Sequence, residues 1–176
     1  MAISVRLATP ADYDAVARFT VDAYRDDGQL ATPTGYEQVL ADVATRAKES
    51  DLLVAEDEHG RVLGSVAYVL PGSRYAELSR DGEAEFRMLA VDPAAQRSGA
   101  GEALVRACLS RAEEAGATAV MICVRDISHR AQKLYGKLGF QRVPELDWSP
   151  VPGVILLALR YQLPADSPGL SPDRAS

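Results

Sequence analysis

Apolar and polar residues change from one repeating period to another along the chain, and these periods predict its first elements. Residues 3–7 alternate between apolar and polar or small side chains, which predicts a strand with one buried face. Apolar residues at helical spacing predict a helix across residues 10–28, opened by a proline and closed by a glycine. A second helix is predicted over residues 33–48, with Val39 and Val43 as its apolar stripe.

A hairpin follows these helices in the predicted order. Residues 52–55 and 62–70 have the composition of strands, and residues 58–61 are predicted to form the turn between them. Glycine, serine and aspartate recur in residues 71–82, which predicts a loop. Alternation returns in residues 84–91, so a further strand is predicted there.

The second half of the chain contains the clearest helical pattern, an apolar stripe within residues 99–116 that has a glycine at each end. The apolar run 119–124 is bounded by charge and predicts a central strand covered on both faces. A short helix is predicted over residues 129–138, and the last strands over residues 140–143 and 154–161.

This order predicts an α/β (α+β) fold with a mixed, mostly antiparallel central sheet flanked by helices. One domain is expected over residues 1–163, with a parallel strand-helix-strand crossover within residues 84–124. Residues 164–176, rich in proline, serine, aspartate and glycine, are predicted to form a disordered tail.

Composition predicts a soluble globular protein and narrows its partners. Of the 176 residues 47% are hydrophobic and 25% charged, and the net charge of -6 favours neither nucleic acid nor an anionic surface. No apolar run reaches the roughly 20 residues that a membrane span needs, and no signal-peptide pattern is present, so a cytoplasmic location is expected. Cys108 and Cys123 lie in apolar stretches without metal-ligand spacing, so reduced thiols and no metal site are expected.

A glycine-containing turn, Gln96-Arg97-Ser98-Gly99-Ala100-Gly101, joins a predicted strand to the clearest helix; it is called the glycine loop below. The first turn of a helix has unpaired N–H groups and the positive end of the helix dipole, so it attracts an anion. Gly99 and Gly101 would let the backbone approach that anion, and Arg97 adds positive charge. The sequence pattern is neither that of a nucleoside-triphosphate loop nor that of a dinucleotide fingerprint, and such a turn can also simply connect two elements.

The glycine loop matches the Gln/Arg-x-x-Gly-x-Gly/Ala signature of the GCN5-related N-acetyltransferases and resembles their pyrophosphate loop. The preceding residues 89–93 resemble the fourth strand of that family. Residues 131–140 resemble its second signature, a helix with a tyrosine followed by a Gly-Phe strand start. The two segments lie at the separation that the family shows, so the sequence is identified as a member of it.

The resemblance implies acetyl-CoA as the acyl donor and no metal. It implies that the pantetheine arm lies along the edge of the strand at residues 89–91, and that backbone N–H groups of the glycine loop hold the pyrophosphate. A backbone N–H near Leu89 would polarise the thioester carbonyl. The residues implied in cofactor binding are Leu89, Ala90, Val91, Gln96, Arg97, Ser98, Gly99, Ala100, Gly101, Ser128, Ala131 and Tyr135. Ser128 stands where the family commonly has asparagine, which puts that contact in question.

Two catalytic roles follow from the same resemblance. Tyr135 is implied as the general acid that protonates the departing thiolate, the alternative being an aromatic that only anchors its helix. Glu85 is the candidate base that removes a proton from the ammonium of the acceptor, the alternative being a solvated carboxylate at a strand edge. Glu83 and His129 are weaker candidates, and binding of the neutral amine would need no base. His59, in a predicted turn, is expected to take no part.

The acceptor is expected to bind between three segments that vary most in the family, here residues 24–36, 71–82 and 144–153. Their aromatic and charged side chains would suit a cationic amine; they are Tyr24, Asp26, Asp27, Tyr36, Arg74, Tyr75, Glu77, Glu145, Asp147 and Trp148. The predicted function is therefore acetyl transfer to a primary amine of a small molecule or peptide. A CoA-binding module without catalysis, and transfer of a longer acyl group, are the alternatives. A homodimer is compatible with the pattern.

Overall fold

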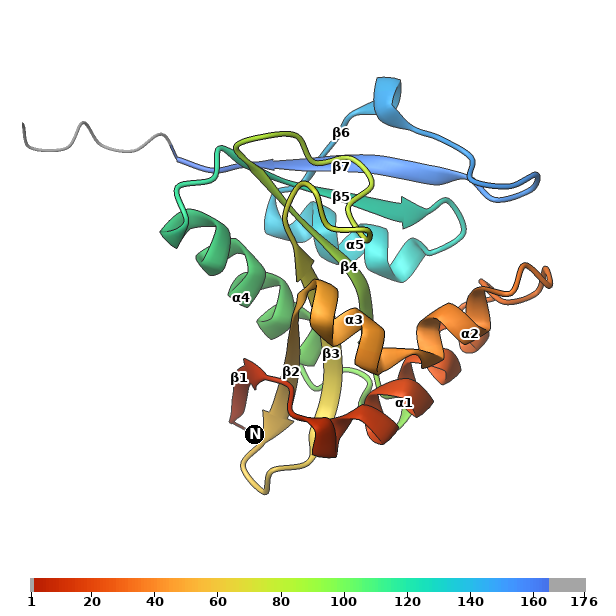
Figure 1. Ribbon diagram of the computed structural model, residues 1–176, viewed down its shortest axis with the longest axis vertical. Coiled ribbons are helices and arrows are strands. Elements are labelled where there is room, and N and C mark those ends of the chain that lie inside the picture. The colour runs from red at the N-terminus through yellow and green to blue at the C-terminus, as the bar shows by residue number, and fades with distance from the viewer. Residues whose placement is uncertain (1, 165–176) are drawn as a thin grey trace, which may run out of the picture.

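The structure is a computed structural model that describes residues 2–164 (Figure 1). The strands are β1 (Ile3–Leu7), β2 (Asp51–Asp57), β3 (Val62–Val69), β4 (Glu83–Val91), β5 (Ala119–Arg125), β6 (Gln141–Arg142) and β7 (Leu156–Gln162). The helices are α1 (Tyr13–Asp26), α2 (Tyr36–Ala41), α3 (Val43–Glu49), α4 (Ala100–Glu114) and α5 (His129–Leu138). The tail predicted at residues 164–176 lies, apart from residue 164, outside the described residues.

One seven-stranded sheet forms the centre of the molecule, in the order β1-β2-β3-β4-β5-β7-β6. All neighbouring strands are antiparallel except β4 and β5, which are parallel and joined through α4. A parallel pair needs such a crossover because the chain must return to the same end of the sheet. The predicted fold class, including the crossover, is confirmed.

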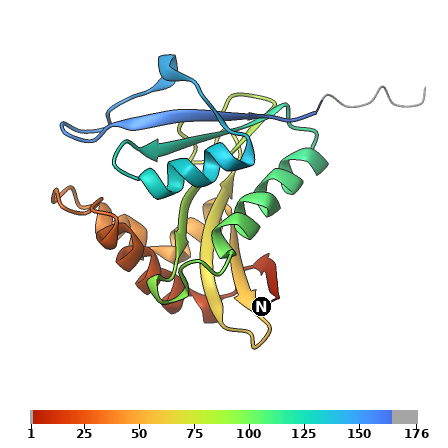
Figure 2. The ribbon, with the colours of Figure 1, turned by 180° about the vertical axis from the view of Figure 1, so that it is seen from behind.

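Helices cover both faces of the sheet: α1 to α3 lie on one face, and α4 and α5 on the other (Figures 1 and 2). The apolar stripe of α4 is buried at Leu104, Val105 and Cys108, as its spacing predicted. On the opposite face, Val16 and Phe19 of α1 are fully buried against the sheet. The two faces thus have separate apolar clusters, and helical and strand periodicity predicted both. None of the described helices has the length and apolar character to cross a membrane.

The single helix predicted at residues 33–48 is wrong, because the chain forms α2 and α3 with a break at Asp42. This residue leaves helical geometry (φ -81°, ψ 70°), and its carboxylate caps α3 by accepting a hydrogen bond from the N–H of Thr45 at 3.2 Å. As a result, Leu40 and not Val39 is the buried residue of α2: Leu40 is fully buried, whereas Val39 is 41% exposed.

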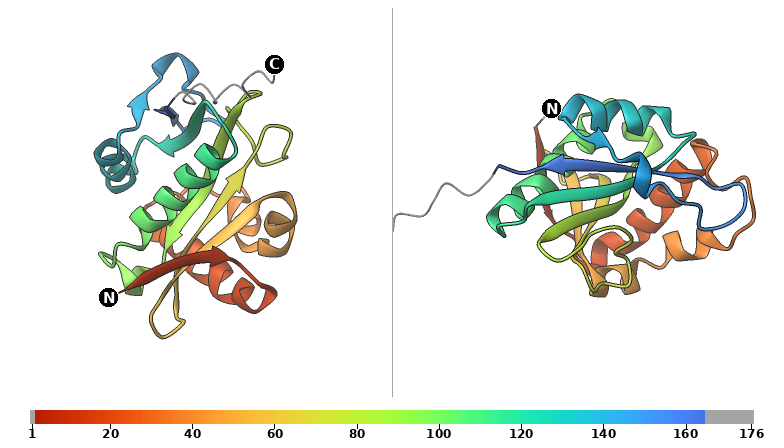
Figure 3. Two further views of the ribbon diagram at one scale, coloured as in Figure 1. Left: turned by 90° about the vertical axis from the view of Figure 1, so that its left-hand side faces the viewer. Right: turned by 90° about the horizontal axis from the view of Figure 1, so that it is seen from above.

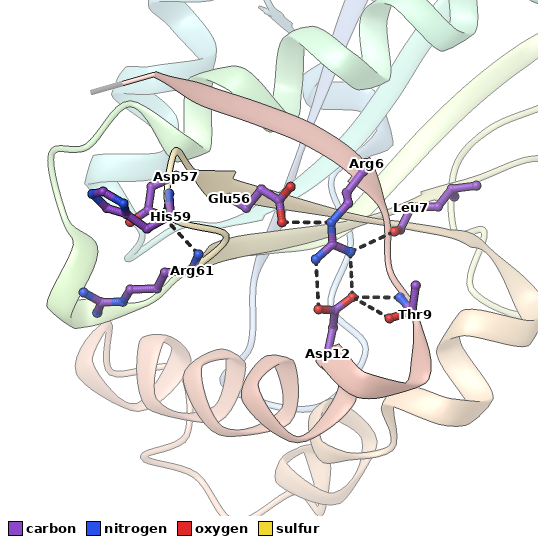
Figure 4. A network of polar contacts seen from close by, with 8 residues as sticks. All are labelled: Arg6, Leu7, Thr9, Asp12, Glu56, Asp57, His59 and Arg61. Atoms are coloured by element: carbon purple, nitrogen blue, oxygen red, sulfur yellow. Dashed lines mark hydrogen bonds and ion pairs between the residues drawn. The ribbon is translucent and has the colours of Figure 1, made fainter.

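A polar network fastens β1 to the start of α1 and to β2 (Figure 4). The guanidinium of Arg6 donates to the carboxylate of Asp12 at 2.8 Å and to that of Glu56 at 2.9 Å. His59 lies in the turn beyond this network with its side chain 83% exposed. It does not line the cavity described below.

β4 and β5 separate along their length. Their pairing runs only from Glu83 opposite Ala119 to Glu85 opposite Met121, although both strands continue beyond it. The loop before β7 and the loop between α1 and α2 approach each other at the end where the two strands diverge (Figure 3). Backbone groups along the facing edges of β4 and β5 are therefore available to a third chain-like group.

Candidate active site

A cavity of about 320 Å³ opens between the diverging parts of β4 and β5. Four residues that the family resemblance assigned to the cofactor line it: Leu89, Ser128, Ala131 and Tyr135. The rest of the wall comes from other residues of β4 and β5, from α1, α2, the loop before β4, the two loops that meet there, and the start of β7. The predicted segments 24–36, 71–82 and 144–153 each contribute to it. The structure thus brings residues distant in sequence to one concave site.

A bulge interrupts β4 at the wall of this cavity. Met88 and Leu89 occupy a place where β3 supplies a single partner, because the register of the β3–β4 pairing shifts after Ser65. Met88 has a positive φ of 55°, which is uncommon outside glycine. A bulge leaves one residue outside the ladder of hydrogen bonds. This places an irregular stretch of backbone beside Leu89, at the position expected to polarise a carbonyl group.

The glycine loop leads from β4 into α4 with alternating backbone conformation. Arg97 (φ 63°) and Gly99 (φ 89°) are both in the left-handed region, and α4 begins at Ala100. Successive N–H groups in such a sequence of conformations point into a common hollow that suits an anion. Gly99 satisfies the requirement for positive φ without strain, whereas Arg97 adopts it at a cost of about 1–2 kcal/mol.

Part of the loop's N–H groups are already used. The N–H of Ser98 donates to the carbonyl of Ala95 at 3.3 Å, and the N–H of Ala100 donates to the hydroxyl of Ser98 at 3.3 Å. From residue 97 onward, the loop N–H groups without an acceptor in the described chain are those of Arg97, Gly99 and Gly101. The expected set of donors for a pyrophosphate is therefore reduced to these three.

The glycine loop also contacts the start of α5. The side chain of Gln96 accepts a hydrogen bond from Arg130, so a second guanidinium lies near Arg97. A Cβ placed on Gly101 would lie 3.6 Å from Leu134 of α5, which is ordinary contact distance. The sequence analysis missed Arg130; its position two residues after Ser128 in the second motif was the available signal.

Ser128 reaches the cavity with its hydroxyl already engaged. The residue is 1% exposed, and its Oγ donates to the carboxylate of Asp27 at 2.5 Å. The same carboxylate accepts from the side-chain amide of Gln29 at 2.8 Å. Ser128 can consequently offer only an acceptor lone pair to the cofactor arm, unlike the asparagine expected in the family.

Tyr135 of α5 faces the cavity from among aromatic neighbours. Its ring centroid lies 5.9 Å from that of Phe86 and 5.6 Å from that of Phe140. Burial raises the pKa of the phenol above its ordinary value. Tyr135 therefore holds its proton at neutral pH, which a general acid must do. The ring also packs in the core, so both readings of this residue find support.

Glu85, the predicted base, does not line the cavity. Its carboxylate is fully buried and accepts hydrogen bonds from the backbone N–H groups of Glu77 (2.9 Å), Leu78 (3.0 Å) and Ser79 (2.8 Å). Oε1 accepts from all three N–H groups and Oε2 from that of Glu77, so the carboxylate is engaged by the loop. The predicted base therefore faces the loop at residues 77–79 and not the cavity. Glu85 fixes the loop at residues 71–82 instead.

The weaker candidates are also elsewhere. Glu83 forms an ion pair with Arg160 at 2.5 Å in a separate hollow, and His129 is exposed in the first turn of α5. Glu77 does line the cavity, and it pairs with Arg87 at 2.7 Å. Burial raises the pKa of Glu77, the Arg87 guanidinium opposes that shift, and the Glu85 carboxylate adds to it.

Only some of the aromatic and acidic residues expected around the acceptor line the cavity. Tyr24 and Tyr36 line the cavity, whereas Tyr75 is buried in an apolar cluster. Trp148 does not line the cavity; it is partly exposed and contacts the lining residue Cys123. Of the acidic residues in the three segments, only Glu77 lines it. Asp27 binds Ser128, Asp147 binds Arg142, and Glu145 borders the separate hollow. Partners distant in sequence fix where these carboxylates lie, as Ser128 does for Asp27. The sequence alone does not reveal such pairs, so it could not show which carboxylates line the cavity.

Cys123 is a wall residue that the sequence analysis took for a core thiol. Its Sγ accepts a hydrogen bond from the indole Nε1 of Trp148 at 3.4 Å. Burial raises the pKa of the thiol to about 12, although the Trp148 hydrogen bond opposes that shift. The thiol is therefore protonated at neutral pH and is not a ready nucleophile, because the thiolate is the reactive form.

Comparison with known proteins agrees with the geometry. The model of the acetyltransferase (GNAT) family matches residues 16–140. An uncharacterised N-acetyltransferase of Schizosaccharomyces pombe is 30% identical over 108 residues, which cover 61% of this chain and 62% of that protein. The match thus spans less than two thirds of the length of that relative.

Solved structures resemble this one over nearly its full described length. A GCN5-related N-acetyltransferase from Kribbella flavida is 27% identical with a TM-score of 0.65, covering 92% of this chain and 98% of its own. The ribosomal-protein-S18-alanine N-acetyltransferase from Escherichia coli is 18% identical with a TM-score of 0.68, covering 97% and 99%. The latter likeness concerns the fold alone. The chain belongs to the acetyltransferase (GNAT) family.

Proposed function

We propose that the protein transfers the acetyl group of acetyl-CoA directly to a primary amine of a small molecule or peptide. The observation that carries this proposal is the separation of β4 from β5 after Glu85. It exposes the bulge at Leu89 and the phenol of Tyr135 to one cavity. A carbonyl polariser and a proton donor on one cavity are what thioester aminolysis needs.

The cofactor would bind along the unpaired edge of β4. Its diphosphate would accept hydrogen bonds from the N–H groups of Arg97, Gly99 and Gly101 at the start of α4. The pantetheine arm would pass the unpaired edge of β4 at Ala90 and Val91, opposite Ser128 and Ala131. These contacts fix the thioester beside Leu89 before the amine arrives.

Each proton and bond in the transfer then has a place. The amine nitrogen attacks the thioester carbonyl carbon, and the backbone at Leu89 stabilises the negative charge that develops on the oxygen. The C–S bond breaks as the C–N bond is completed, and Tyr135 gives its proton to the departing thiolate. The second proton, which the nitrogen loses as the amide forms, restores the phenol of Tyr135. We assign the proton lost by the ammonium to Glu77, because it is the one acidic residue of the loop 71–82 that lines the cavity. Protonated Cys123 leaves direct transfer as the simpler path.

An assay of free CoA thiol tests this function. The purified protein is incubated with acetyl-CoA or with longer acyl-CoAs and a broad panel of primary amines. Thiol release that depends on the added amine is expected, fastest with the acetyl donor. Saturable binding of acetyl-CoA without release across the panel would favour a binding module instead. Faster release from a longer acyl-CoA would correct the donor.

A further inference from the structure

Arg125, the last residue of β5, lines the cavity, although neither the glycine loop nor the acid–base pair involves it. Side chains alternate along a strand, so Arg125 shares a face of β5 with Cys123 and Met121. Cys123 on that face contacts Trp148 from the loop before β7. The opposite face of β5 packs into the cluster that contains Tyr135. Arg125 therefore points to the acceptor side of the strand and away from α5.

The guanidinium of Arg125 lacks a close partner within the described part of the chain. Its Nε is buried and has no hydrogen-bond partner, and the nearest carboxylate oxygen, on Asp126, is 3.9 Å away. The side chain is only 14% exposed. By contrast, Arg87, which is similarly buried with 17% of its side chain exposed, binds Glu77 at 2.7 Å. A buried donor left without an acceptor costs about 1–3 kcal/mol, so an unfilled position of this kind favours binding of an anion.

The strand register places Arg125 at the level of the reaction centre. The last pair of β4 and β5 is Glu85 with Met121. Counting four residues onward along each strand brings Leu89 opposite Arg125, to within the one residue that the bulge inserts. The positive charge thus stands across the cavity from the backbone that would polarise the thioester. Of the two arginines that line the cavity, Arg87 is paired with Glu77 at 2.7 Å, whereas Arg125 has its nearest carboxylate oxygen at 3.9 Å.

We propose that Arg125 binds the carboxylate of the acceptor, so that the acceptor is a free amino acid that carries amine and carboxylate together. This inference rests on the proposed function and names its substrate class. A guanidinium recognises a carboxylate through two parallel hydrogen bonds, which would hold the neighbouring amine in one orientation. Val39, Val151 and Val154 line the same cavity, so the amino acid has an apolar side chain.

Binding of reaction products tests the assignment without turnover. N-acetyl-L-leucine and N-acetyl-L-phenylalanine are titrated by calorimetry into the CoA-saturated protein, beside the carboxamide of each. The acid is expected to bind at least about tenfold more tightly than its amide. Arg125→Gln should remove this difference without changing the affinity for CoA. Arg106→Gln, which removes a guanidinium exposed on α4, is the matched control and should preserve the difference.

The possible results separate the substrate class from the function. Equal binding of acid and amide by the wild-type protein, or an unchanged preference in Arg125→Gln, would overturn the assignment. Weaker CoA binding in Arg125→Gln would overturn it too, by placing the residue on the cofactor. Preference for the acid that depends on Arg125, with no thiol release from any amine, would support the carboxylate site while contradicting the proposed function. Release of CoA thiol with simple amines, together with equal binding of acid and amide, would support the proposed function and contradict the carboxylate site.

Discussion

Glu77 and Glu85 are hydrogen-bonded neighbours with different access to the cavity. The backbone N–H of Glu77 donates to the carboxylate of Glu85 at 2.9 Å, yet only the side chain of Glu77 lines the cavity. Three backbone donors surround the carboxylate of Glu85, whereas Glu77 faces a single guanidinium. A proton from the acceptor can therefore reach one of the two carboxylates and not the other.

Replacing Glu77 with glutamine removes the proposed base. The expected result is a fall in kcat/KM of about 100-fold near neutral pH, a typical loss for a general base. In the wild-type protein kcat/KM should decline as pH falls through the pKa of Glu77, because protonation blocks the base. Burial raises that pKa above its ordinary value of 4.5, so the decline should begin above pH 4.5. The pH dependence of kcat/KM checks this, and retention of the acidic limb in Glu77→Gln would contradict it.

Glu85→Gln is the matched substitution and should act on stability. Its amide NH₂ would face backbone N–H groups that now find an oxygen, which leaves buried donors unsatisfied. A loss of about 1–3 kcal/mol in the free energy of unfolding is expected, with the shape of the pH–rate profile retained. Denaturant unfolding measures the loss of stability, and initial rates at a series of pH values give the pH–rate profile. A stable variant with an altered pH profile would return the role of base to Glu85.

Tyr135→Phe removes one hydroxyl and keeps the ring between Phe86 and Phe140. We expect kcat to fall about 100-fold if this phenol protonates the thiolate, with the CoA dissociation constant and the melting temperature nearly unchanged. Kinetic measurements give kcat, titration calorimetry gives the CoA dissociation constant, and scanning calorimetry gives the melting temperature. Unchanged kcat would leave Tyr135 with a packing role only.

Single residues were predictable from sequence to different degrees. Tyr135 lies where the motif implied, because a helix with an apolar stripe fixes which side chains face the sheet. The surroundings of Glu85 were not predictable, because the pattern of a strand shows which side a residue faces and cannot show that a loop folds over it. Arg125 and Cys123 were missed as wall residues, since both follow from the divergence of two strands rather than from local pattern.

At the scale of elements, the glycine loop shows how backbone conformation prepares a binding site. Arg97 holds a left-handed conformation that glycine would adopt without strain. Arg97→Gly should leave the free energy of unfolding equal or raise it by up to about 1 kcal/mol, while weakening CoA binding about tenfold through the lost charge. Calorimetry and denaturant unfolding test both halves, with Arg97→Lys as the control that keeps the charge. Lower stability without any change in CoA affinity would contradict the assignment.

Element order and type followed from periodicity, and the irregular points did not. Helices α4 and α5 lie where their stripes and flanking glycines predicted. The break at Asp42 was invisible because an aspartate inside a weak stripe reads equally as helix surface or as cap. The bulge at Met88 was not predicted because buried Phe86, Met88 and Ala90 still occupy every second position in the sequence while the pairing with β3 shifts.

For the whole molecule, the sheet consists of two parts joined by a short parallel contact. Only three residue pairs connect β4 to β5, so a ligand lying between their free edges would bridge the two parts. Bound CoA at 100 times its dissociation constant should stabilise the fold by about 2.7 kcal/mol. Hydrogen exchange should show slower exchange along residues 86–91 and 122–125 together. Slowing confined to the start of α4 would contradict a ligand between the strands.

The most direct test of the central claim compares CoA with pantetheine, which has the same thiol arm but no diphosphate. Calorimetric titration into the folded protein should show CoA binding about 100-fold more tightly than pantetheine, a difference of roughly 2.7 kcal/mol. Gly101→Val adds carbons beside Val91 and Leu134 at a proposed N–H donor of the diphosphate, and it should remove most of that difference. Equal affinity for the two ligands, or no heat with CoA, would contradict a diphosphate site in the glycine loop and with it the proposed transfer.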